Sequence, residues 1–219
     1  GMPWCGPHCH RDMISVECAN MRGIGKTFIV AITGASGAAY GWDLLQRLEG
    51  APEVARIYLV VSKPGRDVLL METGRSMAGP DDVERLGLSK AVWLEESDWF
   101  APIASGSCAT DGMVIAPCTM STLGEIAAGT SRNLIHRAAD VCLKERRPLV
   151  LVPRETPLNT IHLSNMLRAA RAGAVILPAM PSFYSRPQSV DDLVGTVSAR
   201  VMAVLGLPLP DNLAWAGRP

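Results

Sequence analysis

Polar side chains follow apolar segments at four points of this 219-residue chain. Hydroxyl groups follow three of the segments, and a charged pair follows the fourth: Ser36 after 28–33, Ser62 after 57–61, Thr119 to Thr122 after 112–115, and Arg154 with Glu155 after 149–152. Because the carboxyl ends of parallel strands meet at one edge of a sheet, we expect these groups to line one crevice. Hydroxyls and a guanidinium suit a phosphate, and a carboxylate can move protons.

The first of these points is a glycine turn. Residues 34–41 read Gly-Ala-Ser-Gly-Ala-Ala-Tyr-Gly and lie between the apolar run and a helical pattern at 42–48. A strand, a glycine turn and a helix N-terminus form an anion site. A dinucleotide fingerprint needs glycine where Ser36 stands, and the segment 57–61 ends in Ser62 and Lys63, not in an acid that binds a ribose. We therefore expect FMN in preference to NAD, with one phosphate on the turn.

Ordinary structural explanations exist for the other strand ends. Ser121 and Thr122 suit a helix cap, which does not exclude contact with a flavin or its phosphate. Arg154 and Glu155 suit a surface ion pair. Pro153 and Pro157 restrict the backbone around this pair at the end of a strand, which favours a functional role.

Composition narrows the class of protein. With 48% hydrophobic and 19% charged residues, the chain can bury one sizeable core. Lys plus Arg and Asp plus Glu both total 21, so neither nucleic acid nor a membrane surface is an expected partner. With no membrane-spanning run and no secretory leader, we expect a cytoplasmic protein. The six cysteines, among them Cys108, Cys118 and Cys142, are expected to be reduced thiols.

Residues 1–25 differ from the rest, and we assign them to an N-terminal extension that begins with a tag scar, followed by one FMN-binding domain at 26–210 and a tail at 211–219. The cluster of Cys5, His8, Cys9 and His10 lacks the second, separated ligand pair of a structural zinc site, so we expect no metal. The tripeptide at 25–27 ends like a P-loop, but it leads into a strand instead of a helix.

Strand and helix patterns alternate along the remaining chain. We predict strands at 28–33, 55–61, 112–115, 149–152 and 174–177, and helical segments at 42–48, 65–72, 133–146 and 160–172. A last helix begins at Ser189 and keeps Leu193, Val194, Val197, Val201 and Val204 on one face. This order predicts an α/β protein with a single-domain, doubly wound parallel sheet, a flavodoxin-like (Rossmann-like) three-layer sandwich.

Four motifs together resemble the UbiX-type flavin prenyltransferases. They are GASGAAYG, Ser105-Gly106-Ser107, RAADVCLKERRPLVLVPRETP from Arg137 to Pro157, and FY followed by RPQS at 183–189. The resemblance covers about 26–215. It implies an enzyme that transfers a dimethylallyl group from dimethylallyl phosphate to N5 and C6 of reduced FMN without a metal. It also implies a homo-dodecamer with active sites at subunit junctions, and a product used by UbiD-type decarboxylases.

The resemblance also implies roles for individual residues. The FMN contacts would be Gly34, Ala35, Ser36, Ser62, Thr119, Met120, Ser121, Thr122 and Arg154, with Thr119 standing where the family usually has serine. The prenyl phosphate would be bound by Lys144, Tyr184 and Arg200, together with Arg137 and Ser105, and the prenyl chain would lie against Trp99 and Trp215. For proton transfer we choose Glu155, aided by Ser36 and Glu72, because a carboxylate beside a flavin in a dry cleft can have its pKa raised toward working pH. The Tyr184 hydroxyl is expected to act on the phosphate, which it would hold together with the cations. Taken alone, Lys144 and Arg200 are also compatible with solvated charges, and both tryptophans with core packing.

Two other functions share this fold and flavin site. The FMN-dependent cysteine decarboxylases carry an asparagine-methionine clamp after a proline, and here Asn159 follows Pro157 and Leu158 without an adjacent methionine. A non-catalytic flavin carrier would need no prenyl-phosphate site. The presence of Lys144, Tyr184 and Arg200 together argues against such a carrier.

Overall fold

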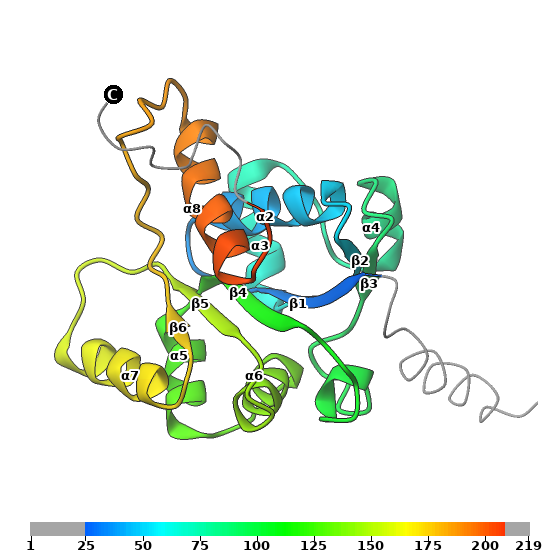
Figure 1. Ribbon diagram of the computed structural model, residues 1–219, viewed down its shortest axis with the longest axis vertical. Helices are drawn as coiled ribbons and strands as arrows, with labels where there is room; N and C mark the ends of the chain where they lie inside the picture. Colours follow the sequence, from blue (N-terminus) through cyan, green and yellow to red (C-terminus); the bar gives the residue numbers. More distant parts are fainter. Residues whose placement is uncertain (1–24, 209–219) are drawn as a thin grey trace, which may run out of the picture.

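The computed structural model describes residues 25–208, which form one parallel sheet between two layers of helices (Figure 1). The six strands are β1 (Lys26–Ile32), β2 (Val54–Val61), β3 (Ala91–Trp93), β4 (Gly112–Cys118), β5 (Leu149–Pro153) and β6 (Val175–Ile176). Their order is β3-β2-β1-β4-β5-β6, which is the order of Rossmann folds. The predicted doubly wound, three-layer α/β class is confirmed.

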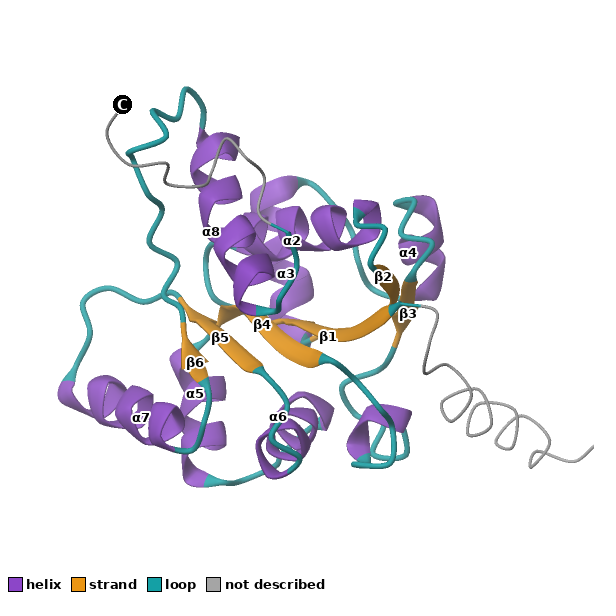
Figure 2. Cartoon of the chain, in the orientation of Figure 1, coloured by secondary structure: helices purple, strands orange, loops and turns teal. Residues whose placement is uncertain are grey.

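Helices cover both faces of the sheet (Figure 2). One layer holds α2 (Ala38–Gly50), α3 (Lys63–Thr73), α4 (Pro80–Arg85) and α8 (Val190–Val204). The other holds α5 (Met120–Ala128), α6 (Leu134–Lys144), α7 (Thr160–Arg171) and the 3₁₀ helix η1 (Pro102–Ala104). Alternate residues of β1 enter the two cores, Val30 and Ile32 on one side, Ile29 and Ala31 on the other. This burial on both faces explains why the strands read as continuous apolar runs.

The predicted elements are all present, with changed limits. The segment expected to be a helical turn at 65–72 is the longer helix α3, because Ser62 Oγ accepts a hydrogen bond from Gly65 N at 3.1 Å and caps it. Strand β4 does not stop before Pro117 but continues to Cys118, which pairs with Pro153. The predicted ranges omitted β3, α4 and η1, which are too short to show a clear period, and included α5 only as a cap at Ser121 and Thr122.

The cap of α5 is formed by a different residue from those expected. Thr119 Oγ1 accepts from Thr122 N at 3.1 Å, so Thr119 is the cap, whereas Ser121 and Thr122 belong to the first turn. The expected cap at Ser121 and Thr122 was therefore wrong, because the cap lies two residues before Ser121. The Thr119 hydroxyl is engaged with the first turn of α5.

The strand order reverses between β1 and β4, and a buried threonine joins the two strand ends there. Thr33 Oγ1 donates to Pro117 O at 2.8 Å and accepts from Thr119 N at 2.9 Å. Thr33 is only 3% exposed, so water does not compete for these bonds. In doubly wound folds this reversal opens the crevice that binds ligands.

Other expectations concern residues at the ends of the chain. The proposed domain limits at 26 and 210 stay predictions. The cluster from Cys5 to His10 lies outside the described residues, and so does Trp215. Cys108, Cys118 and Cys142 are buried, and burial raises the pKa of the Cys142 thiol to about 11. No helix within 25–208 is both long enough and apolar enough to cross a bilayer.

Gly41 allows α2 to pack closely on the sheet, and this contact generates a stability prediction. A Cβ at this position would overlap Ala116 O and reach within 3.0 Å of Ile32 Cγ1. We expect Gly41→Ala to lower the free energy of unfolding by about 1–3 kcal/mol, although alanine is the better helix former. The measurement is denaturant unfolding, with Gly50→Ala on the same helix as the control because open space surrounds Gly50. Equal stability of the two variants would contradict this packing.

Candidate active site

The turn after β1 presents two backbone N–H groups to an anion. Gly37, the N-cap of α2, has a φ of 99°, a conformation that favours glycine. Glu72, from α3, supplies the anion: its Oε2 accepts from Gly37 N at 2.9 Å and from Ala38 N at 2.8 Å. The N–H groups of the turn thus bind an anion, and that anion is a carboxylate of the chain itself. Phosphate binding at this turn stays a prediction and requires that Glu72 leave.

The environment of Glu72 favours its charged form. Partial burial acts to raise the pKa of Glu72, but hydrogen bonds from Ser36 and from the N–H groups of Ala38 and Gly37, together with the charge of Arg154, hold that pKa below its usual range. Ser36 and Glu72, both expected to aid proton transfer, are therefore directly hydrogen bonded. In this arrangement the Glu72 carboxylate is an acceptor and not a proton donor.

Arg154 approaches the same turn from the end of β5. A Cβ built on Gly37 would lie 3.9 Å from Arg154 Cγ and 2.9 Å from the ring of Tyr40. Burial raises the pKa of the Tyr40 hydroxyl, and the charge of Arg154 partly offsets that effect. Three chain segments therefore bring Ser36, Glu72, Tyr40 and Arg154 together at the carboxyl end of the sheet.

The remaining residues expected to contact FMN surround this group. Gly34 packs tightly on α3, since a Cβ there would lie 2.5 Å from Pro64 Cβ. Ala35 and Met120 are buried, and Ser62, Thr119 and Thr122 are engaged in the caps of α3 and α5. Ser121 is exposed in the first turn of α5. Its hydroxyl and the α5 N-terminus can therefore meet a ligand in the crevice.

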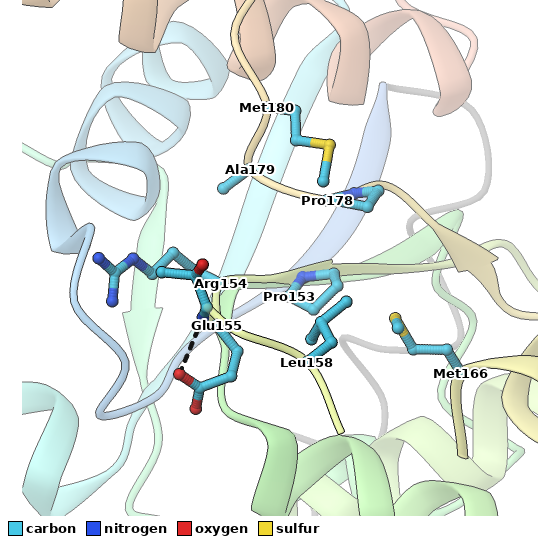
Figure 3. Close-up of a pocket in the computed structure, with 9 residues that line it drawn as sticks. Pro153, Arg154, Glu155, Leu158, Met166, Pro178, Ala179 and Met180 are labelled. Atoms are coloured by element: carbon cyan, nitrogen blue, oxygen red, sulfur yellow. Dashed lines mark hydrogen bonds between the residues drawn. The ribbon is translucent and has the colours of Figure 1, made fainter. Parts of the chain in front are cut away.

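A cavity of about 290 Å³ lies beside the end of β5 (Figure 3). Its walls are mainly apolar, with Leu158, Met166 and Met180 among the lining residues. Glu155 also lines it, and its Oε1 accepts from Thr156 N at 3.0 Å. The Arg154 side chain extends away from Leu158 and Met166 in Figure 3, in the direction opposite to the apolar wall. Arg154 can thus contact a charged group on one side, while the apolar wall of the cavity holds an apolar chain on the other side.

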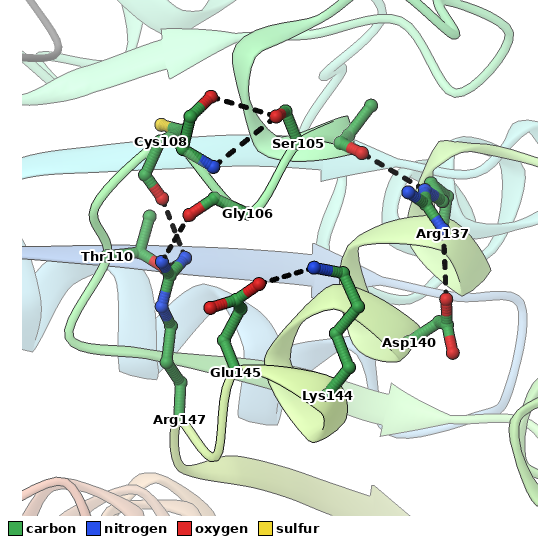
Figure 4. A network of polar contacts seen from close by, with 11 residues as sticks. Ser105, Gly106, Cys108, Thr110, Arg137, Asp140, Lys144, Glu145 and Arg147 are labelled. Atoms are coloured by element: carbon green, nitrogen blue, oxygen red, sulfur yellow. Dashed lines mark hydrogen bonds and ion pairs between the residues drawn. The ribbon is translucent and has the colours of Figure 1, made fainter.

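The residues expected to bind the prenyl phosphate are divided between two other places. The first place is α6 and the loop before β4 (Figure 4). There Arg137 donates to Ala104 O at 3.0 Å and to Asp140 Oδ2 at 2.9 Å, while Lys144 forms an ion pair with Glu145. Ser105 Oγ lies 2.8 Å from Ser107 Oγ.

Lys144 lies far from the crevice within one chain. It ends α6 just before the chain enters the amino end of β5, whereas Arg154 follows the carboxyl end of that strand. The second place is the segment 177–189 and α8. Tyr184 is 55% exposed, Arg200 is exposed on α8, and Ser182 N donates to Thr196 Oγ1 at 3.1 Å, which holds this segment against α8. Trp99 is 45% exposed and is not a core residue.

Sequence reasoning did not assign a role to three residues of these groups. Tyr40 stood inside the recognised glycine motif, one helical turn after Gly37, and its spacing was a usable signal. Thr33 was counted only as the end of the first strand. Arg147 stood in the recognised block but was not separated from its basic neighbours, and no local pattern distinguishes it.

The described residues bring together no group of three or more His, Cys, Asp or Glu side chains that could hold a metal. The arrangement at the carboxyl end offers hydroxyls, a guanidinium and a helix N-terminus, which are donors suited to a phosphate and to the polar edge of a flavin. The adjacent cavity offers apolar surface and a carboxylate. These features are typical of a site that binds an anionic mononucleotide beside an apolar group.

Comparison with known proteins agrees with this class. The sequence profile of the Flavoprotein family matches residues 19–202, so the chain belongs to that family. It is 50% identical over 189 residues to the probable UbiX-like flavin prenyltransferase of Streptomyces sp. (strain D7), covering 86% of this chain and 91% of that protein. Within the flavoproteins, the chain is thus a member of the UbiX-like flavin prenyltransferase family.

Solved structures support the same membership. The dodecameric FMN-dependent UbiX-like decarboxylase from Escherichia coli O157:H7 is 46% identical, with a TM-score of 0.79, over 87% of this chain and 100% of that one. AnUbiX (PadA1), solved in complex with FMN and dimethylallyl pyrophosphate, is 39% identical with a TM-score of 0.77, over 89% of this chain and 100% of that one. The recognised family and the fold are confirmed together.

The bonds of Glu72 lead to a prediction about pH. Because its folded pKa lies below the ordinary 4.5, Glu72 stabilises the fold fully above about pH 4.5, and the contribution is lost as the pH falls through the folded value. We expect Glu72→Gln to cost roughly 0.5–1 kcal/mol at neutral pH and less in acid. Thermal unfolding from pH 7 to pH 3 measures this difference, with Glu84→Gln, an exposed carboxylate of α4, as the control. A pH-independent difference would mean that the Glu72 charge is not the stabilising element.

Proposed function

We propose that this protein is a flavin prenyltransferase, which transfers a dimethylallyl group from dimethylallyl phosphate to reduced FMN. The observation that carries the proposal is the convergence of Ser36, Glu72 and Arg154 at the strand-order reversal, beside a cavity that Glu155 lines, in a member of this family. Reduced FMN, when bound, supplies the nucleophilic N5 and C6 atoms that receive the prenyl group.

The phosphate of FMN is best accommodated at the N-terminus of α5. A phosphate at the α2 N-terminus would meet the Glu72 carboxylate, which already accepts two N–H groups there. The N-terminus of α5 has no acidic residue in its first turn, and Ser121 is exposed there. In this arrangement Gly34, Ala35 and Ser36 face the flavin ring, while Arg154 offsets the charge of the bound ligand.

The prenyl phosphate needs cations, and we assign this task to Lys144, Arg137 and Ser105 together with Tyr184 and Arg200. Since Lys144 and Arg154 lie at opposite ends of β5, one chain does not complete the site. We infer that neighbouring copies complete it in a homo-dodecamer. Two observations support this assembly: a relative with 46% identity is dodecameric, and α7 exposes large apolar side chains, Ile161 at 67%, Leu163 at 51% and Leu167 at 52%.

Departure of the allylic phosphate leaves cationic character on the carbon chain, which must be kept from water. The cavity of about 290 Å³, with its wall of Leu158, Met166 and Met180, is wide enough for a five-carbon group. Trp99 can offer a ring face to the developing positive charge, and Trp215 stays a further prediction. The protein cations bind the leaving phosphate, so we expect turnover to be independent of added metal.

Glu155 is assigned to proton transfer. It lies beside Arg154 at the cavity, and within residues 25–208 its carboxylate accepts one hydrogen bond, from Thr156 N to Oε1, which leaves Oε2 available in that part of the chain. Ser36 and Glu72 form a second polar pair across the crevice. Because the Glu72 carboxylate already accepts several hydrogen bonds, Glu155 is the better candidate for the group that takes up and returns a proton.

The product is expected to serve a UbiD-type decarboxylase, and we place the protein in the cytoplasm. The free, buried thiols of Cys118 and Cys142 support a reducing compartment. The absence of any charge surplus supports a small-molecule partner instead of nucleic acid.

The central test of the proposal is the mass of the flavin. We expect the purified protein, mixed anaerobically with reduced FMN and dimethylallyl phosphate, to yield a flavin heavier by one dimethylallyl group and changed in absorbance. EDTA should leave the yield unchanged. Mass spectrometry of the extracted flavin is the measurement, and omission of dimethylallyl phosphate is the control. Recovery of unmodified FMN alone would refute the activity.

A second prediction isolates the proton step. Glu155→Gln keeps the size of the side chain but loses its basicity, so FMN should still bind while product formation falls by about 100- to 10,000-fold. Tyr184→Phe should instead raise the requirement for dimethylallyl phosphate. Absorbance and mass of the flavin against time separate the two effects, with Glu84→Gln as the control. If Glu155→Gln forms the product at the wild-type rate, Glu155 does not transfer the proton and is only a structural partner of Arg154.

A further inference from the structure

The Arg147 side chain forms hydrogen bonds with the loop that carries Ser105, and no local sequence pattern predicts these contacts. Its side chain donates from Nη1 to Cys108 O at 2.6 Å and to Thr110 Oγ1 at 3.4 Å, and from Nη2 to Gly106 O at 2.7 Å. Figure 4 shows the guanidinium inside the curve of the 105–110 loop. A planar fork can hold several acceptors in fixed directions, which a lysine cannot do.

The same loop lies directly against the end of α6. A Cβ built on Gly106 would overlap Glu145 Oε1 and lie 2.8 Å from Lys144 Nζ. The position of the loop backbone therefore limits where the Lys144 ammonium and its Glu145 partner can be. Any shift of residues 105–110 moves the Ser105 hydroxyl and the Lys144 charge relative to each other.

We propose that Arg147 is a positioning residue for the prenyl phosphate, acting by holding the 105–110 loop against Lys144. The inference rests on the proposed function, because it assumes that Ser105 and Lys144 bind that phosphate. Arg147 itself is engaged with the loop acceptors and does not contact the substrate. The arrangement predicts that loss of the guanidinium fork weakens phosphate binding and spares flavin binding at the other end of the sheet.

The test compares two neighbouring arginines. Arg147→Lys keeps the charge but loses the fork, whereas Arg146→Lys alters an exposed side chain one position earlier. Calorimetry on the FMN-loaded oligomer measures affinity for dimethylallyl phosphate, and fluorescence titration measures affinity for FMN. We expect Arg147→Lys to weaken dimethylallyl phosphate binding on the order of 10- to 100-fold, with FMN affinity unchanged, and Arg146→Lys to match the wild type.

Steady-state kinetics separate positioning from general destabilisation. A positioning role raises KM for dimethylallyl phosphate with kcat nearly unchanged, whereas a merely structural role lowers kcat and FMN affinity together. If Arg147→Lys does not fold, Gly106→Ala serves instead, because its Cβ meets only the ends of flexible side chains and displaces Lys144 without breaking the fork. Gly50→Ala, in open space, is its control.

The outcomes distinguish the two proposals. A wild-type protein that binds FMN but not dimethylallyl phosphate would overturn the proposed function and this inference with it. A wild-type protein that binds both, with equal affinities in Arg147→Lys or in the folded Gly106→Ala, would overturn the inference alone. A selective loss of dimethylallyl phosphate affinity in Arg147→Lys supports the inference, and the same loss in Gly106→Ala, where Arg147 is intact, supports its second half, that the position of the 105–110 loop controls Lys144.

Discussion

The hydroxyl of Thr33 is the link on which the crevice depends. It bridges Pro117 O and Thr119 N at 2.8 and 2.9 Å, and so joins the ends of β1 and β4 where the strand order reverses. At 3% exposure these bonds are protected from water. Without them Thr119 N would lose its bond to Thr33 Oγ1, and Pro117 O would keep the backbone bond from Thr33 N at 3.2 Å. The turn at Gly34 and the start of α5 follow directly from these two ends, so the Thr33 hydroxyl extends the pairing of β1 with β4 up to the crevice.

Two carboxylates of the chain occupy positions that suit a ligand anion. Glu72 accepts the N–H groups of Gly37 and Ala38, and Glu145 pairs with Lys144. Both pairs satisfy charges or donors that would otherwise face solvent. A phosphate bound near either position would therefore have to exchange with a carboxylate or bind beside it.

The division of the charged groups between the two ends of the sheet is the strongest argument for assembly. Parallel strands place Arg154 and Glu155 at the carboxyl end of β5, and the connection from α6 places Lys144 at its amino end. Because the length of β5 separates Lys144 from Arg154, rotation of their side chains does not bring the two charges together. A site that uses all of these groups must draw on more than one copy, and this need matches the exposed apolar residues of α7.

The sequence by itself determined the layered class and the main strands, because apolar runs and glycine turns reflect local backbone preference, and it predicted which polar groups follow the strand ends. It also predicted an anion site at the turn before α2. Only the tertiary structure decided that Glu72, from α3, occupies that site, that Thr119 and not Ser121 caps α5, and that Tyr40 meets Arg154. The role of Arg147 and the separation of Lys144 from Arg154 also required the fold. Apart from the cap of α5, which is a local contact between Thr119 and Thr122, these outcomes depend on contacts between segments far apart in the chain, and such contacts leave no periodic signal in any one segment.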